Sequence, residues 1–256
     1  MDTFFNLELI GRDIAVLRNS DDKKKDKVIS MTDSTDNIRN PLELVETNKG
    51  EKIQVIPSSQ SERSVIYVVG MSGSGKSHWT TNYVKEYKKK FKKNKIYVIS
   101  PITDDKNINS LKGIRINPNS EAYMSDPPTV EDFQDSLLIC DDIEAYDKKT
   151  VNRILNLVNS ICTTGRHFKT SLIFLAHTAT NGNMSKILLS ESQAIVLFPA
   201  TMAGKTSKYL LDSYFGLDKK QIEKVKKVKT RAIVIMRTYP MVIVTENIVV
   251  PLEKFE

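Results

Sequence analysis

Cysteine is scarce in this sequence of 256 residues, and the two that occur, Cys140 and Cys162, lack the spacing of a metal site. Cys140 lies within an apolar run, which favours a small core residue over a redox centre. Both observations predict that the protein works in a reducing, cytoplasm-like compartment.

Long apolar runs are also missing. No segment approaches the run of about 18 apolar residues that a membrane-spanning helix needs. The first residues, 1–8, lack the basic start and apolar stretch of a secretory signal. We therefore expect a protein that is neither secreted nor associated with a membrane.

Positive charge is present in excess, but it is distributed unevenly. The net charge is +7. Residues 1–60 carry nine basic and eleven acidic side chains, whereas residues 61–256 carry 29 basic and 20 acidic ones. The basic excess therefore belongs to the larger, C-terminal part of the chain, and it suggests a polyanionic partner.

The length and the 40% hydrophobic content predict a globular protein with one α/β domain and a small N-terminal appendage. We interpret residues 1–61 as the appendage, with loops and a few strand-like pieces such as 53–56. The mixed-charge run at 21–27 and the polar segment at 30–39 indicate loops within it. Residues 62–256 are interpreted as the main domain.

From residue 64 onward, patterns of buried strands and helices alternate. Apolar side chains spaced by four between 79 and 91 mark one of the helices. The alternation predicts a mainly parallel central sheet flanked by helices. Two apolar runs around a proline-containing turn, 231–236 and 241–244, predict an antiparallel hairpin at the sheet edge. The runs without a polar face, expected for strands covered on both sides, are 65–69, 96–99, 137–140, 172–175 and 194–198.

The strongest signal is a complete phosphate-binding loop, or Walker A motif, between the first of these strands and the next helix. Its glycines let backbone N–H groups turn toward the β-phosphate, and the helix N-terminus adds the positive end of its dipole. Lys76 is expected to reach the β- and γ-phosphates, and the Ser77 hydroxyl to bind Mg²⁺. ATP and Mg²⁺ are therefore the predicted cofactors. The predicted nucleotide-binding residues are Gly70, Met71, Ser72, Gly73, Ser74, Gly75, Lys76, Ser77 and His78.

The apolar strand at 137–140 ends in acids, which is the pattern of a Walker B motif. Asp141 is expected to hold Mg²⁺ through water, opposite Ser77. A second carboxylate would polarise the attacking water, and both Asp142 and Glu144 are candidates for this role.

Two more segments supply candidate catalytic groups. His177 and Thr178 follow the strand at 172–175 and are candidates for contacting the γ-phosphate or its water. Arg166 lies between a helix and that strand. It is either an arginine finger that acts in a neighbouring subunit's site or a surface arginine that a helix C-terminus favours.

Two stretches are rich in lysine. Residues 85–95 contain seven lysines and one glutamate, and residues 219–231 contain six lysines and one arginine against one glutamate. Both patterns fit a solvated helix face, and both also fit contacts with nucleic-acid phosphates. No base-reading motif accompanies them, so such binding would have little sequence specificity.

The phosphate-binding loop, the acidic pair at 141–142 and the Gly-Arg-His run at 165–167 together resemble a known group. They look like the genome-packaging ATPases of large DNA viruses, poxvirus type, in the FtsK/HerA clan of P-loop NTPases. The resemblance covers residues 64–200. The clan usually has Gln at the tip of the strand after Walker B, whereas this chain has His177 or Thr178 there.

The resemblance implies ATP hydrolysis that drives double-stranded DNA into a capsid. It implies a homo-oligomeric ring in which Arg166 acts between subunits and lysines line the DNA path. Capsid proteins are further implied partners, and the implied location is the virion or the host cytoplasm.

Two other functions fit parts of the sequence. A small-molecule P-loop kinase has a suitable length, but its lid needs several arginines, and residues 205–231 offer lysines without an arginine cluster. A protein that uses bound nucleotide as a switch for partner binding is the second alternative, although the complete Walker motifs argue against it.

Overall fold

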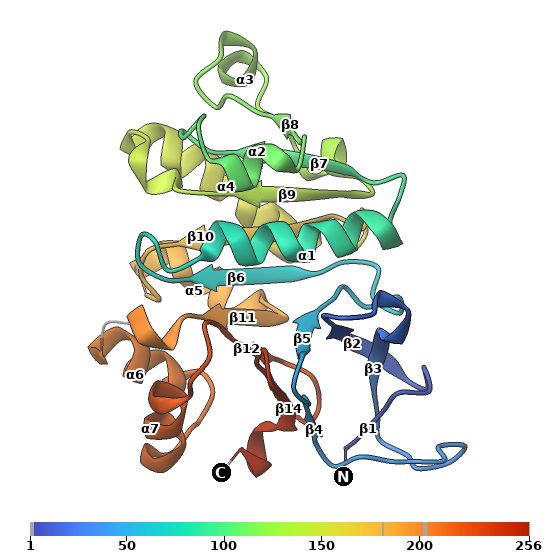
Figure 1. The fold of residues 1–256 in the computed structure, drawn as a ribbon. Coiled ribbons are helices and arrows are strands. Elements are labelled where there is room, and N and C mark those ends of the chain that lie inside the picture. The colour runs from blue at the N-terminus through green and yellow to red at the C-terminus, as the bar shows by residue number, and fades with distance from the viewer. Residues whose placement is uncertain (1–2, 181, 202–203, 256) are drawn as a thin grey trace.

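The computed structural model describes residues 3–180, 182–201 and 204–255, which are built around a ten-stranded sheet (Figure 1). The strand order is β4-β14-β13-β12-β11-β6-β10-β9-β7-β8. The parallel part consists of β11 (Ala194–Leu197), β6 (Val65–Val69), β10 (Ser171–Ala176), β9 (Ser136–Cys140), β7 (Lys95–Ile99) and β8 (Ile114–Arg115). The antiparallel part consists of β12 (Ile233–Met236), β13 (Val242–Val244), β14 (Ile248–Pro251) and β4 (Val45–Glu46).

The predicted mainly parallel sheet and the C-terminal antiparallel hairpin are both confirmed. The hairpin, β12 and β13, does not lie at the edge of the sheet, because β14 and β4 extend the sheet beyond it. The edge position was predicted because β4 comes from the N-terminal segment and its pairing is not visible in the local pattern.

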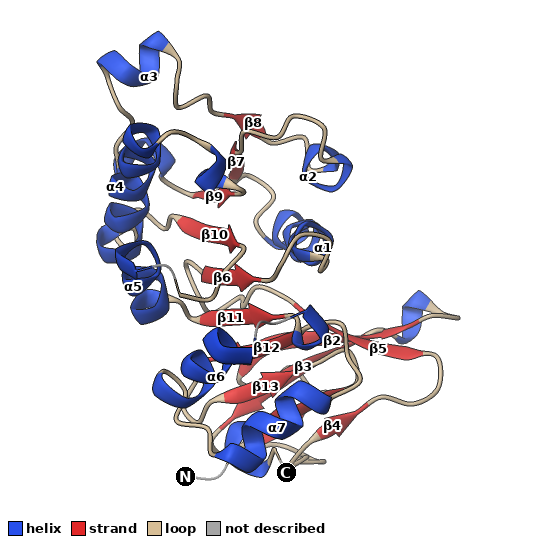
Figure 2. Cartoon of the chain, turned by 90° about the vertical axis from the view of Figure 1, so that its left-hand side faces the viewer, coloured by secondary structure: helices blue, strands red, loops and turns tan. Residues whose placement is uncertain are grey.

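Helices cover both faces of the sheet (Figure 2). α1 (Lys76–Lys90) and α2 (Lys106–Ser110) lie on one face. α4 (Lys148–Thr164), α5 (Gly182–Glu191), α6 (Gly204–Ser213) and α7 (Lys219–Lys227) lie on the other, and the short α3 (Glu121–Ser125) projects beyond β8 (Figure 1). No helix within the described ranges combines the length and apolarity needed to cross a membrane.

The missing polar face of the parallel strands follows from this layering. Successive side chains of a strand point to opposite faces. In β6, Tyr67 therefore joins the core beneath α4 and α5, whereas Ile66 and Val68 join the core beneath α1. Each fully buried apolar side chain of this kind stabilises the fold by about 1.5–3 kcal/mol.

The N-terminal segment forms a second, four-stranded antiparallel sheet with the order β1-β3-β2-β5. Its strands are β1 (Phe4–Asn6), β2 (Arg12–Asn19), β3 (Lys27–Thr32) and β5 (Glu51–Val55). Phe5, Ile14 and Ile29 of this sheet share a core with the α1 side of the large sheet. The segment contains more strand than the sequence predicted, because the apolar runs of β2 and β3 are short and lie next to charged residues such as Arg18 and Lys27.

Candidate nucleotide-binding site

The predicted Walker motifs meet at one edge of the sheet. β6, β10 and β9 are adjacent and parallel, so the residues that follow them emerge at the same edge. They surround an open cleft of about 560 Å³. Its lining consists of Met71, Ser72, Gly73, Gly75, Lys76, Ser77, His78, Ile102, Asp104, Asp105, Asn107, Asp141, Asp142, His177 and Arg231.

The loop before α1 has a backbone that fits a phosphate group. Gly73 and Gly75 adopt left-handed conformations, with φ of +75° and +112°. A Cβ atom at Gly70 would lie 2.5 Å from the Ser74 hydroxyl, so that turn also requires glycine. No side chain caps the N-terminus of α1, and its first backbone N–H groups are therefore available to an anion.

Lys76 and His177 connect the phosphate-binding loop to the Walker B acids. The Lys76 ammonium donates to the Gly70 carbonyl oxygen at 2.8 Å and lies 3.4 Å from Nδ1 of His177. Nε2 of His177 lies 2.7 Å from Oδ1 of Asp142. Burial lowers the pKa of Lys76, and the nearby Asp142 and Asp141 carboxylates oppose that shift. The site thus brings one cation, one imidazole and two carboxylates together.

Asp141 is almost completely buried beside Lys76. Burial raises its pKa to about 7, the Asp142 and Asp105 carboxylates reinforce the shift, and Lys76 opposes it. A divalent cation next to Asp141 would favour the ionised carboxylate.

The donor atoms in the cleft fit Mg²⁺. Carboxylate and hydroxyl oxygens are the donors that Mg²⁺ prefers, and Asp141 and Ser77 both line the cleft. Within the described part of the chain, no group of three or more His, Cys, Asp or Glu side chains could hold a metal ion. Mg²⁺ is usually held by one or two side chains together with the phosphates of a nucleotide.

The remaining candidates differ in their position relative to the cleft. Asp142 adopts a left-handed turn, with φ of 50°, and its carboxylate lies within the cleft. Glu144 and Thr178 are not among the lining residues. One carboxylate oxygen of Glu144 is buried and lacks a hydrogen-bond partner among the described residues, and the Thr178 carbonyl accepts from the Tyr67 hydroxyl at 3.0 Å.

Arg166 is exposed and lies in the loop between α4 and β10. That loop precedes β10, whereas His177 and the rest of the cleft follow the parallel strands. Arg166 therefore lies at the opposite edge of the sheet from the phosphate-binding loop of its own chain.

Arg231 begins the run 231–236, which the sequence predicts as a strand of the C-terminal hairpin, and the structure places it in the cleft. A Cβ atom at Gly75 would lie 2.9 Å from Nε of Arg231. β12 runs antiparallel to β11, so the residues before β12 lie at the carboxyl edge of the parallel strands. The predicted hairpin could have indicated this position. A strand that pairs antiparallel with the last parallel strand begins at the end of the sheet where the parallel strands finish, so the residues just before it lie beside the site.

A protein of Sputnik virophage with the name uncharacterized protein V3 is 36% identical to the chain over 213 residues, which cover 79% of this chain and 85% of that protein. The chain belongs to the V3 family. No model of a protein family matches it.

Solved structures reveal the same fold as this V3-family chain. One is the genome-packaging NTPase B204 from Sulfolobus turreted icosahedral virus 2 in complex with ATP-gammaS, with a TM-score of 0.50, 15% identity and coverage of 72% of this chain and 97% of B204. Another is B204, the DNA-packaging ATPase from Sulfolobus turreted icosahedral virus, with a TM-score of 0.50, 15% identity and coverage of 73% and 97%. The predicted resemblance to viral genome-packaging ATPases is confirmed at the level of the fold.

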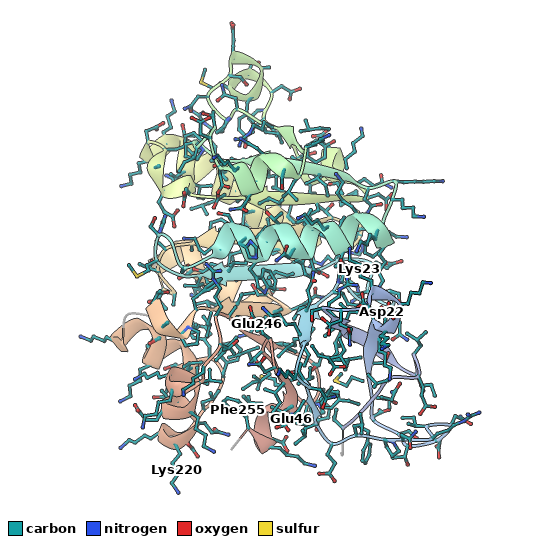
Figure 3. All side chains as sticks on the ribbon, viewed as in Figure 1. Asp22, Lys23, Glu46, Lys220, Glu246 and Phe255 are labelled. Carbon is teal, nitrogen blue, oxygen red and sulfur yellow. The ribbon has the colours of Figure 1, made fainter. Side chains whose placement is uncertain are left out.

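The two lysine-rich stretches of the V3-family chain lie at different edges of the sheet. Residues 92–95 lead into the amino end of β7, whereas α7 leads toward Arg231 at the carboxyl edge. Three lysines of the first stretch already bind other groups: Lys88 donates to the Leu111 carbonyl, Lys89 pairs with Glu86, and Lys90 pairs with Asp13. On α7, Ile222 and Val225 are buried and the lysines are exposed, with Lys220 projecting from the helix (Figure 3).

Substitutions can distinguish the roles of Asp141, Asp142 and Glu144. Asp141→Asn is expected to weaken the binding of Mg²⁺ with ATP, because the buried ligand oxygen loses its charge. Asp142→Asn is expected to leave binding unchanged and to slow hydrolysis, because its carboxylate contacts His177 and faces the cleft. Binding and single-turnover hydrolysis would be measured separately. Slower hydrolysis in Glu144→Gln, with normal hydrolysis in Asp142→Asn, would reverse the assignment of the base.

Proposed function

We propose that the chain is an ATPase that moves double-stranded DNA, in the packaging of a viral genome into a capsid. The convergence of Lys76, Asp141, Asp142 and His177 on one cleft beside a phosphate-binding loop carries the enzymatic part of this proposal. The fold shared with B204 and the relationship to a virophage protein support the packaging role.

In this proposal, the N–H groups of the loop and the Lys76 ammonium bind the β- and γ-phosphates. Ser77 and Asp141 hold Mg²⁺, which neutralises charge on those phosphates. Asp142 orients the attacking water, and His177 keeps Asp142 and Lys76 in a fixed relation through its two ring nitrogens. Negative charge that builds on the departing γ-phosphate is then only partly covered by Lys76.

In such sites an arginine commonly neutralises the remaining negative charge of the transition state. Arg166 lies at the far edge of the sheet and is exposed, so it is available to the site of a second copy. The proposed active unit is therefore a homo-oligomeric ring in which each Arg166 enters the cleft of its neighbour. Capsid proteins are the proposed further partners of that ring.

The α7 lysines are the proposed DNA contact, because they lie at the same edge as the nucleotide site. Linear duplex DNA is expected to raise the rate of ATP hydrolysis. This stimulation should decline steeply as the salt concentration rises, because each phosphate contact contributes about −0.9 to the slope of log affinity for DNA against log salt concentration. Replacing Lys224 and Lys227 of α7, together with Lys229 just after the helix, with Ala (the α7 variant) should flatten this dependence.

The matched control removes equal charge from the other stretch, with Lys85, Lys92 and Lys93 replaced by Ala. Stimulation that is unchanged in the α7 variant would leave these lysines as a solvated face. ATP consumption that is unchanged by duplex DNA but requires an added nucleoside would favour the small-molecule kinase alternative instead.

A further inference from the structure

A second cavity, of about 260 Å³, adjoins the phosphate cleft and shares Gly75, His78 and Arg231 with it. We call this cavity the side chamber. It lies between α1, the ends of β12 and β13, and the N-terminal sheet. Its lining consists of Arg18, Lys52, Ile53, Gln54, Val55, Gly75, His78, Trp79, Asn82, Tyr83, Phe198, Arg231, Ala232, Val244, Thr245 and Glu246.

The order of the strands determines the direction in which a bound nucleotide must run. The catalytic groups Asp142 and His177 follow β9 and β10, which lie on one side of β6. A γ-phosphate that points toward them leaves the α-phosphate on the other side of β6, where β11 and β12 lie. The nucleoside therefore leaves the loop on the side where Phe198 and Ala232 line the side chamber.

The chemistry of the side chamber suits a nucleoside better than a phosphate. Trp79 stacks on Tyr83, with ring centroids 5.6 Å apart and an interplanar angle of 13°. Aromatic faces of this kind bind bases by stacking. The amide nitrogen of Gln54 donates to the Asn82 carbonyl at 3.0 Å, which leaves the amide oxygen to accept from an amino or hydroxyl group.

The charges around the side chamber largely cancel. Arg18 pairs with Asp26 at 2.5 Å and with Glu86 at 2.8 Å. Lys52 and Glu246 add one charge of each sign to the lining, and Glu246 lies next to β5 (Figure 3). Arg231 is the remaining cation of the lining and is shared with the neighbouring cleft, so the side chamber lacks the excess of positive charge expected of a separate phosphate site.

We propose that the side chamber binds the base and ribose of the nucleotide and that β5 of the N-terminal sheet forms its outer wall. This inference rests on the proposed ATPase function. It gives the N-terminal segment a direct part in nucleotide binding, because Lys52 and Gln54 would contact the nucleoside. A hydrogen bond of 2.8 Å from the Ile53 N–H to the Glu246 carbonyl joins the wall to the turn between β13 and β14 of the main sheet.

The test compares a nucleotide with a ligand that has phosphates but no nucleoside. Gln54→Phe would fill the chamber from the β5 wall, and Lys49→Phe, in the turn before β5 and outside the lining, is the matched control. Affinities for ATP-gammaS and for inorganic tripolyphosphate, each with Mg²⁺, would be measured by calorimetry. We expect Gln54→Phe to weaken ATP-gammaS about tenfold or more and tripolyphosphate less than about twofold, with no change in the control.

Wild-type affinity of Gln54→Phe for ATP-gammaS would overturn the proposal, and so would equal weakening of both ligands. A second measurement needs no variant: Trp79 is the only tryptophan of the chain, and its fluorescence should respond to ATP-gammaS but not to tripolyphosphate. Trp79 fluorescence that does not change when ATP-gammaS binds would also overturn the proposal. Failure of the unmodified chain to bind either ligand would instead overturn the proposed ATPase function, and the chamber assignment with it.

Discussion

Replacing Lys76 with Ala is expected to reduce ATP hydrolysis by far more than tenfold, close to the limit of detection. The ammonium is buried at the start of α1 and lines the cleft, and in the proposed mechanism it is the cation that follows the γ-phosphate as charge develops. Multiple-turnover hydrolysis would be measured at saturating Mg²⁺ and ATP. An exposed lysine of the same helix offers the matched control, and Lys85→Ala should hydrolyse ATP at the normal rate.

Circular dichroism would show whether the Lys76→Ala variant keeps its fold. Since Lys76 also donates to the Gly70 carbonyl, some rearrangement of the loop is expected without loss of the sheet. Retention of more than about a tenth of the wild-type rate would contradict the assignment of this lysine.

Arg166→Ala is expected to slow hydrolysis by roughly 10³-fold, the usual size of an arginine-finger effect. Arg166 lies at the opposite end of the strands from the cleft of its own chain. A neighbouring subunit with an intact Arg166 should therefore restore hydrolysis in a cleft whose own chain carries the substitution. Mixing Arg166→Ala with Lys76→Ala subunits should restore part of the activity, since some interfaces then pair an intact loop with an intact arginine.

Arg231 gives this mixing experiment a matched control within the chain. It lies in the same cleft as Lys76 of its own chain. Where Arg231→Ala alone is inactive, a mixture of Arg231→Ala and Lys76→Ala subunits has no site with both side chains and should show no restored activity. The trans role of Arg166 would be wrong if its mixture stayed inactive while both variants assembled, or if Arg166→Ala hydrolysed ATP normally.

Local patterns of the sequence were sufficient for the parallel strands β6, β7, β9, β10 and β11 and for the core of the site, whereas the two-residue strand β8 was not predicted. β6 is a run of five buried residues followed by a complete phosphate-binding loop, and residues 65–141 contain both features together with Asp141 and its strand. Once strands are parallel, groups that follow them must share an edge. The meeting of Lys76, Asp141 and His177 in one cleft follows from that rule.

The features that the sequence did not reveal depend on pairing between distant segments. The place of Arg231 in the cleft depends on the antiparallel return of β12 against β11. The pairing of β4 with β14 brings together residues about 200 positions apart in the sequence. Local periodicity cannot predict a pairing between such distant segments. Asp105 was missed for another reason, because it follows β7 in a polar loop that lacks a motif.

The movement of duplex DNA by ATP hydrolysis is the central claim, and displacement of a third strand tests it most directly. A triplex-forming oligonucleotide would be bound near one end of a linear duplex, and its release would be followed after addition of the protein with Mg²⁺ and ATP. The account predicts release that requires hydrolysis, so that ATP-gammaS and the Lys76→Ala variant give none. Release without hydrolysis, or no release by a chain that hydrolyses ATP and binds the duplex, would contradict it.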